Sequence, residues 1–129
     1  MIRKLIAITL VCLFAISVTN AQGPTGRAVT QITTITTGVT VNADTGVITT
    51  VSSTLAALTA TTFTVTNSRV EANSAVVASI ENYSGTYVTN GLPRVTVNNV
   101  VAGAFDIVIC NDHPTAALAG VLKIAFHVR

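Results

Sequence analysis

The stretch Cys110-Asn111-Asp112-His113-Pro114 places a thiol, a carboxylate and an imidazole close together in the chain. A cysteine nucleophile needs a histidine base within about 3 Å and a third group that orients this base. Neighbours at the end of a strand rarely meet these conditions, because alternate side chains point to opposite faces. Pro114 also biases His113 to extended backbone. We therefore interpret the stretch as a strand that runs into a turn, and we predict no catalytic residue in it.

The other groups that could do chemistry are scattered along the chain. A metal site would have to combine His113 and His127 with Asp112 or Cys110, and no ligand spacing supports one. No glycine-rich phosphate loop is present. The carboxylates have no spacing that would pair them for acid–base catalysis, and they are Asp44, Glu71, Glu81, Asp106 and Asp112. The sequence therefore predicts no enzyme, no metal site and no cofactor.

Two tyrosines, Tyr83 and Tyr87, lie near the turn signal at residues 82–85, and the chain has no tryptophan. Exposed aromatic rings stack on sugar rings, so this pair could contact a glycan. The alternative is ordinary packing at the base of a loop, because tyrosine is commonly part-buried. Asn82-Tyr83-Ser84 also matches an N-glycosylation acceptor, which matters only where the source modifies such sites.

The N-terminus has the pattern of a secretory signal peptide. Arg3 and Lys4 precede an apolar run at residues 5–18, and small residues occupy the cleavage positions before Gln22. We predict a signal peptide at residues 1–21 and an exported protein, secreted or at the cell surface. The apolar run is shorter than the roughly 18–20 residues of a transmembrane helix, so we expect membrane contact only through an uncleaved leader.

Removal of the leader changes the charge and the cysteine count. The seven basic residues of the chain become five, against five acidic ones, because Arg3 and Lys4 are lost. A neutral domain has no basic stripe, which excludes nucleic acid as an expected partner. Cys12 is also lost, so Cys110 has no partner for an intramolecular disulfide. We interpret Cys110 as a small buried apolar residue, with an intermolecular bridge as the alternative.

After a flexible segment at residues 22–28, residues 29–129 are dominated by Thr, Val, Ala, Ile and Asn. β-Branched residues favour extended backbone, and turn signals recur about every ten residues. This pattern is typical of one antiparallel β-sandwich of about eight short strands. Residues 53–60 could form a helical turn or a crossing loop. The strands are expected at 30–36, 39–42, 47–51, 63–67, 75–81, 86–89, 94–101, 104–111 and 122–129.

Alternation predicts which faces are buried. Phe63 and Val65 should point inward, as should the alternate residues of 122–129, which are Leu122, Ile124, Phe126 and Val128. Residues 104–111 are apolar on both faces. We therefore place this strand at the centre of a sheet, or with its second face against another subunit.

Three pieces of the chain, GRAVTQITTITTGVTVNADTGVITT, FTVTNSRVEANSAVVASI and VAGAFDIVICND, occur in an order that resembles a small all-β module of bacteriophage and related virus structural proteins. Such modules belong to head-decoration, fibre or tail-spike chains. The resemblance covers about residues 26–129 and includes a final strand of the KIAFHV kind. It implies a jelly-roll-like sandwich, often trimeric, that covers or projects from a particle and contacts host-surface glycans. The signal peptide departs from this pattern, because a virion protein assembled in the cytoplasm needs no export.

The composition favours association. The mean hydropathy is +0.65 and only 9% of the residues are charged, against about a quarter in typical domains. So little charge leaves aliphatic and Thr-rich surface to be covered, and we expect a homo-oligomer, a trimer most of all. The alternative is a Thr-coated monomer. We predict a non-enzymatic structural or attachment module with a capsid or cell-surface partner, on a virion or as an exported protein. The alternative function is a secreted carbohydrate-binding domain.

Overall fold

The computed structural model describes residues 26–129, and the predicted signal peptide lies outside the described residues. Residues 26–129 contain no helix, and therefore none that could cross a membrane. They form eight strands, which are β1 (Arg27–Thr30), β2 (Val39–Thr40), β3 (Thr45–Thr49), β4 (Ala60–Thr66), β5 (Val76–Tyr83), β6 (Pro93–Val101), β7 (Ala104–Asn111) and β8 (Leu122–Val128).

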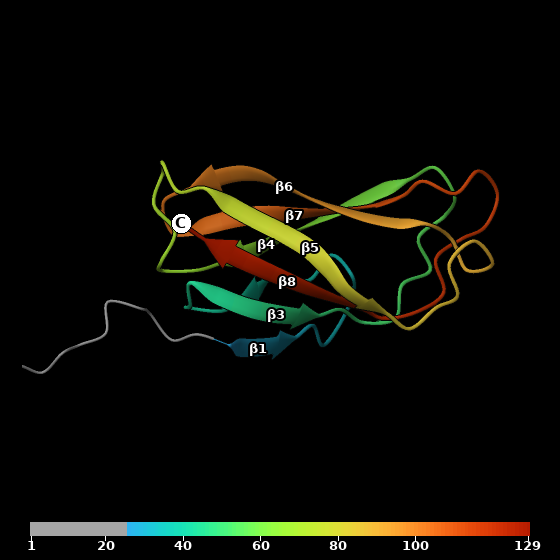
Figure 1. Cartoon of the computed structure of the whole chain (residues 1–129), viewed down its shortest axis with the longest axis horizontal. Coiled ribbons are helices and arrows are strands. Elements are labelled where there is room, and N and C mark those ends of the chain that lie inside the picture. The colour runs from blue at the N-terminus through green and yellow to red at the C-terminus, as the bar shows by residue number, and fades with distance from the viewer. Residues whose placement is uncertain (1–25) are drawn as a thin grey trace, which may run out of the picture.

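The strands form two four-stranded sheets that lie against each other as two layers (Figure 1). One sheet has the order β1-β3-β8-β5, and the other has the order β2-β4-β7-β6. The predicted all-β, sandwich-like fold is confirmed at this level. The prediction of an antiparallel sandwich fails at two edges, where β1 pairs with β3 and β2 pairs with β4 in parallel.

One long hairpin connects the two layers, because its β6–β7 half lies in one sheet and its β5–β8 half lies in the other. β6 and β7 pair around a turn that contains Gly103, whose φ of 83° favours glycine. The two arms of this hairpin continue through loops into β5 and β8, which pair with each other in the other sheet. β3 and β4 then flank β8 and β7 on the opposite side. The last strand, β8, therefore joins β3 to β5.

The core lies between the layers and follows from the alternation of each strand. The inward faces predicted for residues 63–67 and 122–129 are confirmed, because those side chains are at most 7% exposed. The rings of Phe105 and Phe126 lie 5.7 Å apart and join the two sheets. The largest fully buried apolar side chains are Phe63, Phe105, Ile48, Ile107, Ile109, Leu118, Leu122, Ile124 and Val65.

β7 lies between β4 and β6, which confirms its predicted central place. The side chains on its outward face, Asp106, Val108 and Cys110, are half-buried between those of the neighbouring strands. Cys110 is a free thiol, and it is only half-buried, which is less than we predicted. Its neighbours across the sheet are Ala60 on β4 and Arg94 on β6.

Two of the predicted strands are loops, and residues 53–60 form no helix. Only Thr30 of the predicted strand 30–36 is in β1, because Gln31 turns inward and Ile32 is 87% exposed. β1 instead begins at Arg27, inside the segment we expected to be flexible. Residues 86–89 belong to a loop with a single bridge between Val88 and Gly91.

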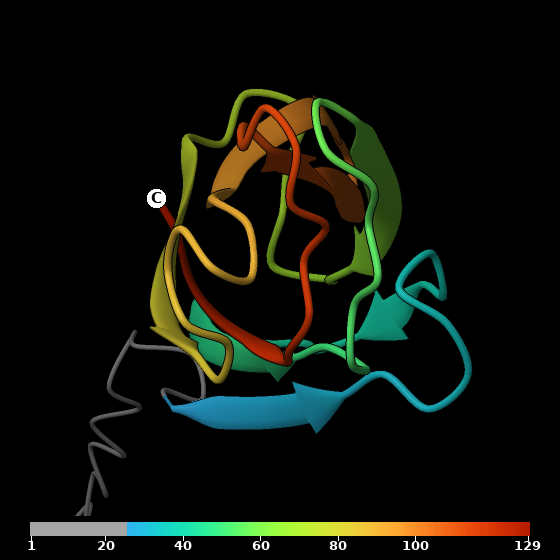
Figure 2. The ribbon, with the colours of Figure 1, turned by 90° about the vertical axis from the view of Figure 1, so that its right-hand side faces the viewer.

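The chain alternates between the two ends of the sandwich. Odd-numbered strands run toward one end and even-numbered strands run toward the other (Figure 1). Four loops therefore gather at the first end, which Figure 2 shows facing the viewer. They connect β1 to β2, β3 to β4, β5 to β6, and β7 to β8.

Candidate functional site

The Cys110–Pro114 stretch sits where β7 enters one of these loops, and its centre is the buried side chain of Asn111, 1% exposed. The Asn111 Nδ2 donates to the carbonyl oxygens of Leu55 (3.1 Å) and Ala116 (2.8 Å). Its Oδ1 accepts from the backbone N–H groups of Leu92 (3.0 Å) and His113 (3.1 Å). One amide therefore ties three loops together and uses both of its polar atoms.

His113 stabilises the same loop. Its Nδ1 accepts hydrogen bonds from the backbone N–H groups of Thr115 (3.1 Å) and Ala116 (2.7 Å). One of the two imidazole nitrogens is therefore engaged with backbone. The thiol of Cys110 lies on the outward face of β7, opposite Arg94. This arrangement agrees with the interpretation of the stretch as a strand end.

Asp112 belongs to an exposed ion pair. The Arg94 Nε lies 2.7 Å from the Asp112 Oδ2, and the second guanidinium bond measures 3.3 Å. The hydrogen bond from Arg94 lowers the pKa of Asp112 below its usual value of 3.8. The same bond raises the pKa of Arg94. Both side chains are about half exposed, so solvent screens the pair.

The two tyrosines have different environments. Tyr83 is 7% exposed, and its hydroxyl donates to the Asn90 carbonyl and accepts from the Ala119 N–H. Tyr87 is 52% exposed and meets the Tyr83 ring edge to face, with the ring centres 5.5 Å apart. Tyr83 therefore packs at a loop base and holds two loops together, whereas a ligand could reach Tyr87.

The four loops carry one charged side chain, Asp112, which is paired with Arg94. We call residues 31–38, 50–59, 84–92 and 113–121 the charge-free end, since they contain no Asp, Glu, Lys or Arg. Six large apolar side chains in the described part of the chain are exposed, and four of them lie here. These four are Ile32 (87%), Leu58 (71%), Val88 (61%) and Tyr87 (52%).

The opposite end of the sandwich is charged. Its connections and the C-terminus carry Asp44, Arg69, Glu71 and Arg129. The domain therefore has one charged end and one end where apolar side chains are exposed and the one loop charge, Asp112, is paired with Arg94. Monomeric domains rarely leave such a surface uncovered, so the charge-free end is the candidate interaction site.

Two of its exposed apolar residues have left-handed backbone. Leu58 has a φ of 57° and Val88 a φ of 74°. This conformation costs an L-residue about 1–2 kcal/mol, and it is a clear outlier for a β-branched residue such as Val88. Backbone strain of this kind gathers at sites that bind ligands or partners.

A second buried amide shapes the loop at residues 31–38. Gln31 is 2% exposed, and its Nε2 donates to the carbonyl oxygens of Ile35 (3.1 Å) and Thr37 (2.8 Å). Its backbone N–H bonds to Thr49 O at 2.9 Å, as if continuing β1. The Gln31 Oε1 is buried and has no partner among the described residues.

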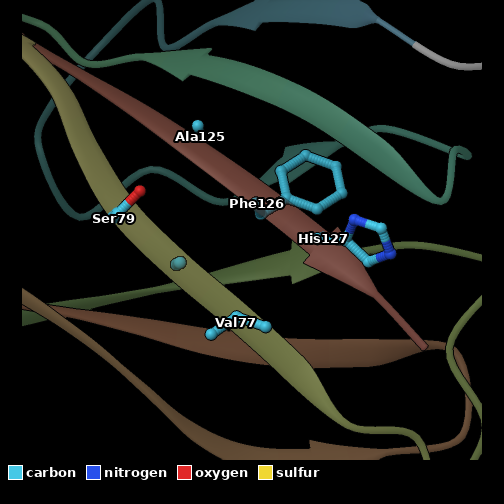
Figure 3. A pocket seen from close by; sticks show the side chains of 6 residues that line it. Val77, Ser79, Ala125, Phe126 and His127 are labelled. Atoms are coloured by element: carbon cyan, nitrogen blue, oxygen red, sulfur yellow. The ribbon is translucent and has the colours of Figure 1, made fainter.

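The described surface has a small hollow and a larger groove. The small hollow, of about 180 Å³, lies over β5 and β8, where Val77, Ser79, Ala125 and His127 line it (Figure 3). The larger groove, of about 490 Å³, lies within the charge-free end, between the loops at residues 31–38 and 50–59. Within residues 26–129, no group of His, Cys, Asp or Glu side chains converges to hold a metal ion.

No family model, curated protein or solved structure matches this chain. Its function must therefore be inferred from its own surface and loops.

Sequence reasoning singled out Tyr83 and Tyr87 and missed the charge-free end. The signal was present, because the charged residues avoid four separate segments of the chain. It could not be read before the fold was known, since only the strand directions bring these segments to one end. Gln31 gave no signal, because a glutamine in a Thr-rich run resembles a surface residue.

We predict that Asn111→Asp disrupts the charge-free end. A carboxylate cannot donate to the Leu55 and Ala116 carbonyls, and each buried group left unpaired costs about 1–3 kcal/mol. The free energy of unfolding should fall by several kcal/mol in denaturant titrations, and hydrogen exchange should rise in three loops. The matched control is Asn73→Asp, at an exposed turn of the opposite end. Equal stability of the two variants would contradict the role of Asn111.

We also predict a pH-dependent contribution from Asp112. The pKa of Asp112 is lower in the folded state than its usual value of 3.8. The ionised side chain therefore contributes to the stability of the fold above pH 3.8, and this contribution is lost as the pH falls through the pKa of the folded state. The wild type should be slightly more stable than Asp112→Asn at pH 7, and this difference should shrink in acid and in high salt. Thermal unfolding of both proteins from acid to pH 7 measures this difference in stability. A difference that stays constant with pH would refute the role of the ionised Asp112.

Proposed function

We propose that this protein is a non-enzymatic structural or attachment module that acts through surface contacts, including contacts with its own copies. The observation that carries the proposal is the charge-free end, with its four exposed apolar side chains. Burying one such side chain contributes about 1.5–3 kcal/mol. The three loops that carry these side chains contain no Asp, Glu, Lys or Arg, which keeps the cost of association low.

The position of the chain ends supports this proposal. Gly26 bonds to Thr45 at the start of β3, and Arg129 bonds to Ala75 at the start of β5. Both ends of the described chain therefore lie away from the charge-free end (Figure 1). A module attached through either end would direct the charge-free end outward, toward a particle, a cell surface or another copy.

The finer fold that we propose is jelly-roll-like. A long hairpin folded across two layers, with a strand added on its far flank in each layer, is the arrangement by which such sandwiches form. The resemblance to phage decoration, fibre and tail-spike modules supports this proposal, with a trimer as the assembly. The predicted signal peptide favours an exported surface protein over a virion component.

The alternative function is a secreted carbohydrate-binding domain. The observation that favours it is the exposed ring of Tyr87 at the charge-free end, where a sugar ring could stack. Tyr83 would support that ring from below through its edge-to-face contact.

The proposal is tested by locating the protein in its source culture. Mass spectrometry of density-purified particles and of the cell-free fraction would find its peptides in one or the other. Peptides that band with particles, in amounts comparable to other coat proteins, support a virion module. Peptides only in the secreted or envelope fraction support an exported surface module. A protein found only in the cytoplasm, without surface association, would overturn both.

We predict that Val88→Asn separates stability from attachment. Asparagine tolerates left-handed backbone, so the variant should gain about 1 kcal/mol in stability. It also loses an exposed apolar side chain of the charge-free end, so its cosedimentation with cells or particles should weaken. Val77→Asn is the control, because Val77 is 58% exposed on β5, outside that end. Equal attachment of the two variants would exclude the loop around Val88 from the contact.

A further inference from the structure

The groove between the loops at residues 31–38 and 50–59 has the size and lining of a ligand site. Its volume of about 490 Å³ lies within the range of small-molecule sites, about 300–1,000 Å³. Thr33, Thr34 and Ile35 line it from the first loop, and Val51, Thr54 and Leu55 line it from the second.

The polar side chains among the lining residues are all neutral Thr or Ser side chains. Within the described residues, the hydroxyls of Thr33, Ser52 and Thr54 have no hydrogen-bond partner in the protein. A hydroxyl can donate one hydrogen bond and accept others, so each can serve either role toward a ligand. The aliphatic residues Ile35, Val51 and Leu55 also line the groove.

The walls of the groove are fixed by contacts behind them. The carbonyl oxygen of Leu55 accepts from Asn111 Nδ2 (3.1 Å) and from the backbone N–H of Leu118 (2.9 Å). The carbonyl oxygen of Ile35 accepts from Gln31 Nε2 (3.1 Å). The two buried amides therefore hold one wall each, and a ligand does not have to order the loops as it binds.

We propose that this groove binds a neutral polyhydroxylated ligand, a saccharide unit of the surface to which the module attaches. No charged side chain lines the groove, so a phosphate, a carboxylate or a cation would lose hydration without a countercharge. A purely apolar ligand would bury the Thr hydroxyls without partners. A sugar ring matches both the aliphatic and the hydroxyl-bearing residues of the groove. Its C–H face can pack on the aliphatic side chains, and its hydroxyls can bond to the Thr side chains.

This inference rests on the charge-free end being the surface that the protein presents. It differs from the sugar contact of the alternative function, because Tyr87 does not line the groove. The loops at residues 31–38 and 50–59 bind the ligand, Gln31 and Asn111 act as positioning residues, and Tyr87 lies on a separate loop.

The test is titration of the purified protein with neutral trisaccharides built from glucose, mannose, xylose and N-acetylglucosamine, followed by NMR. Trigalacturonate serves as the acidic counterpart. Binding should shift the amide signals of residues 33–35 and 51–56. The double variant Thr33→Val and Thr54→Val keeps the side-chain shape and removes one hydroxyl from each wall. It should bind the same sugar about 10-fold or more weakly, since a hydrogen bond contributes about 0.5–1.5 kcal/mol.

The matched control is the double variant Thr62→Val and Thr96→Val on the outer face of the sheet that contains β4 and β6, where both threonines are exposed. It should bind like the wild type. Equal weakening in both double variants overturns the assignment, as does exclusive binding of trigalacturonate. Shifts centred on Tyr87 would move the site there, and absence of binding by every neutral sugar at millimolar concentration would end the proposal. Saccharide binding without surface attachment would overturn only the proposed function. Surface attachment without saccharide binding would overturn only this inference.

Discussion

The buried amide of Asn111 is the constraint on which the charge-free end depends. Loops that meet at the end of a sandwich cannot use the ladder bonds of a sheet, and their buried backbone groups still need partners. A primary amide offers both donors and acceptors without a charge, so it can pair with N–H and C=O groups together. The opposite end uses the same solution, since the side chain of Asn67, 0% exposed, bonds to both backbone groups of Ala43 and to the Arg69 N–H.

The strands were predictable wherever alternation met the core. β7 and β8 were found almost residue for residue, because Phe105, Ile107 and Ile109 recur at the period of a strand and are bounded by turn residues. The parallel pairs at β1 and β2 were not predictable. These strands have four and two residues, and their pairing is set by the layers they join rather than by their own pattern.

The predictions of strands at residues 30–36 and 86–89 failed for one shared reason. Both segments contain β-branched residues, which favour extended backbone, yet their backbone follows side-chain bonds from other positions. Gln31 holds the first loop through two carbonyls, and Tyr83 and Asn90 hold the second. Local propensity is a weak guide where a buried polar side chain determines the path of the chain.

The folded-over hairpin has a consequence for how the chain must fold. The β6–β7 turn can form early, because its partners are neighbours in sequence. β3 and β5 cannot join into one sheet until β8 arrives, and Thr45 then pairs with His127 across most of the domain. Closing so long a loop is slow, so the sheet that contains β8 stays open until that strand has been synthesised. An open chain of this kind is the form in which a polypeptide can be threaded through a narrow channel.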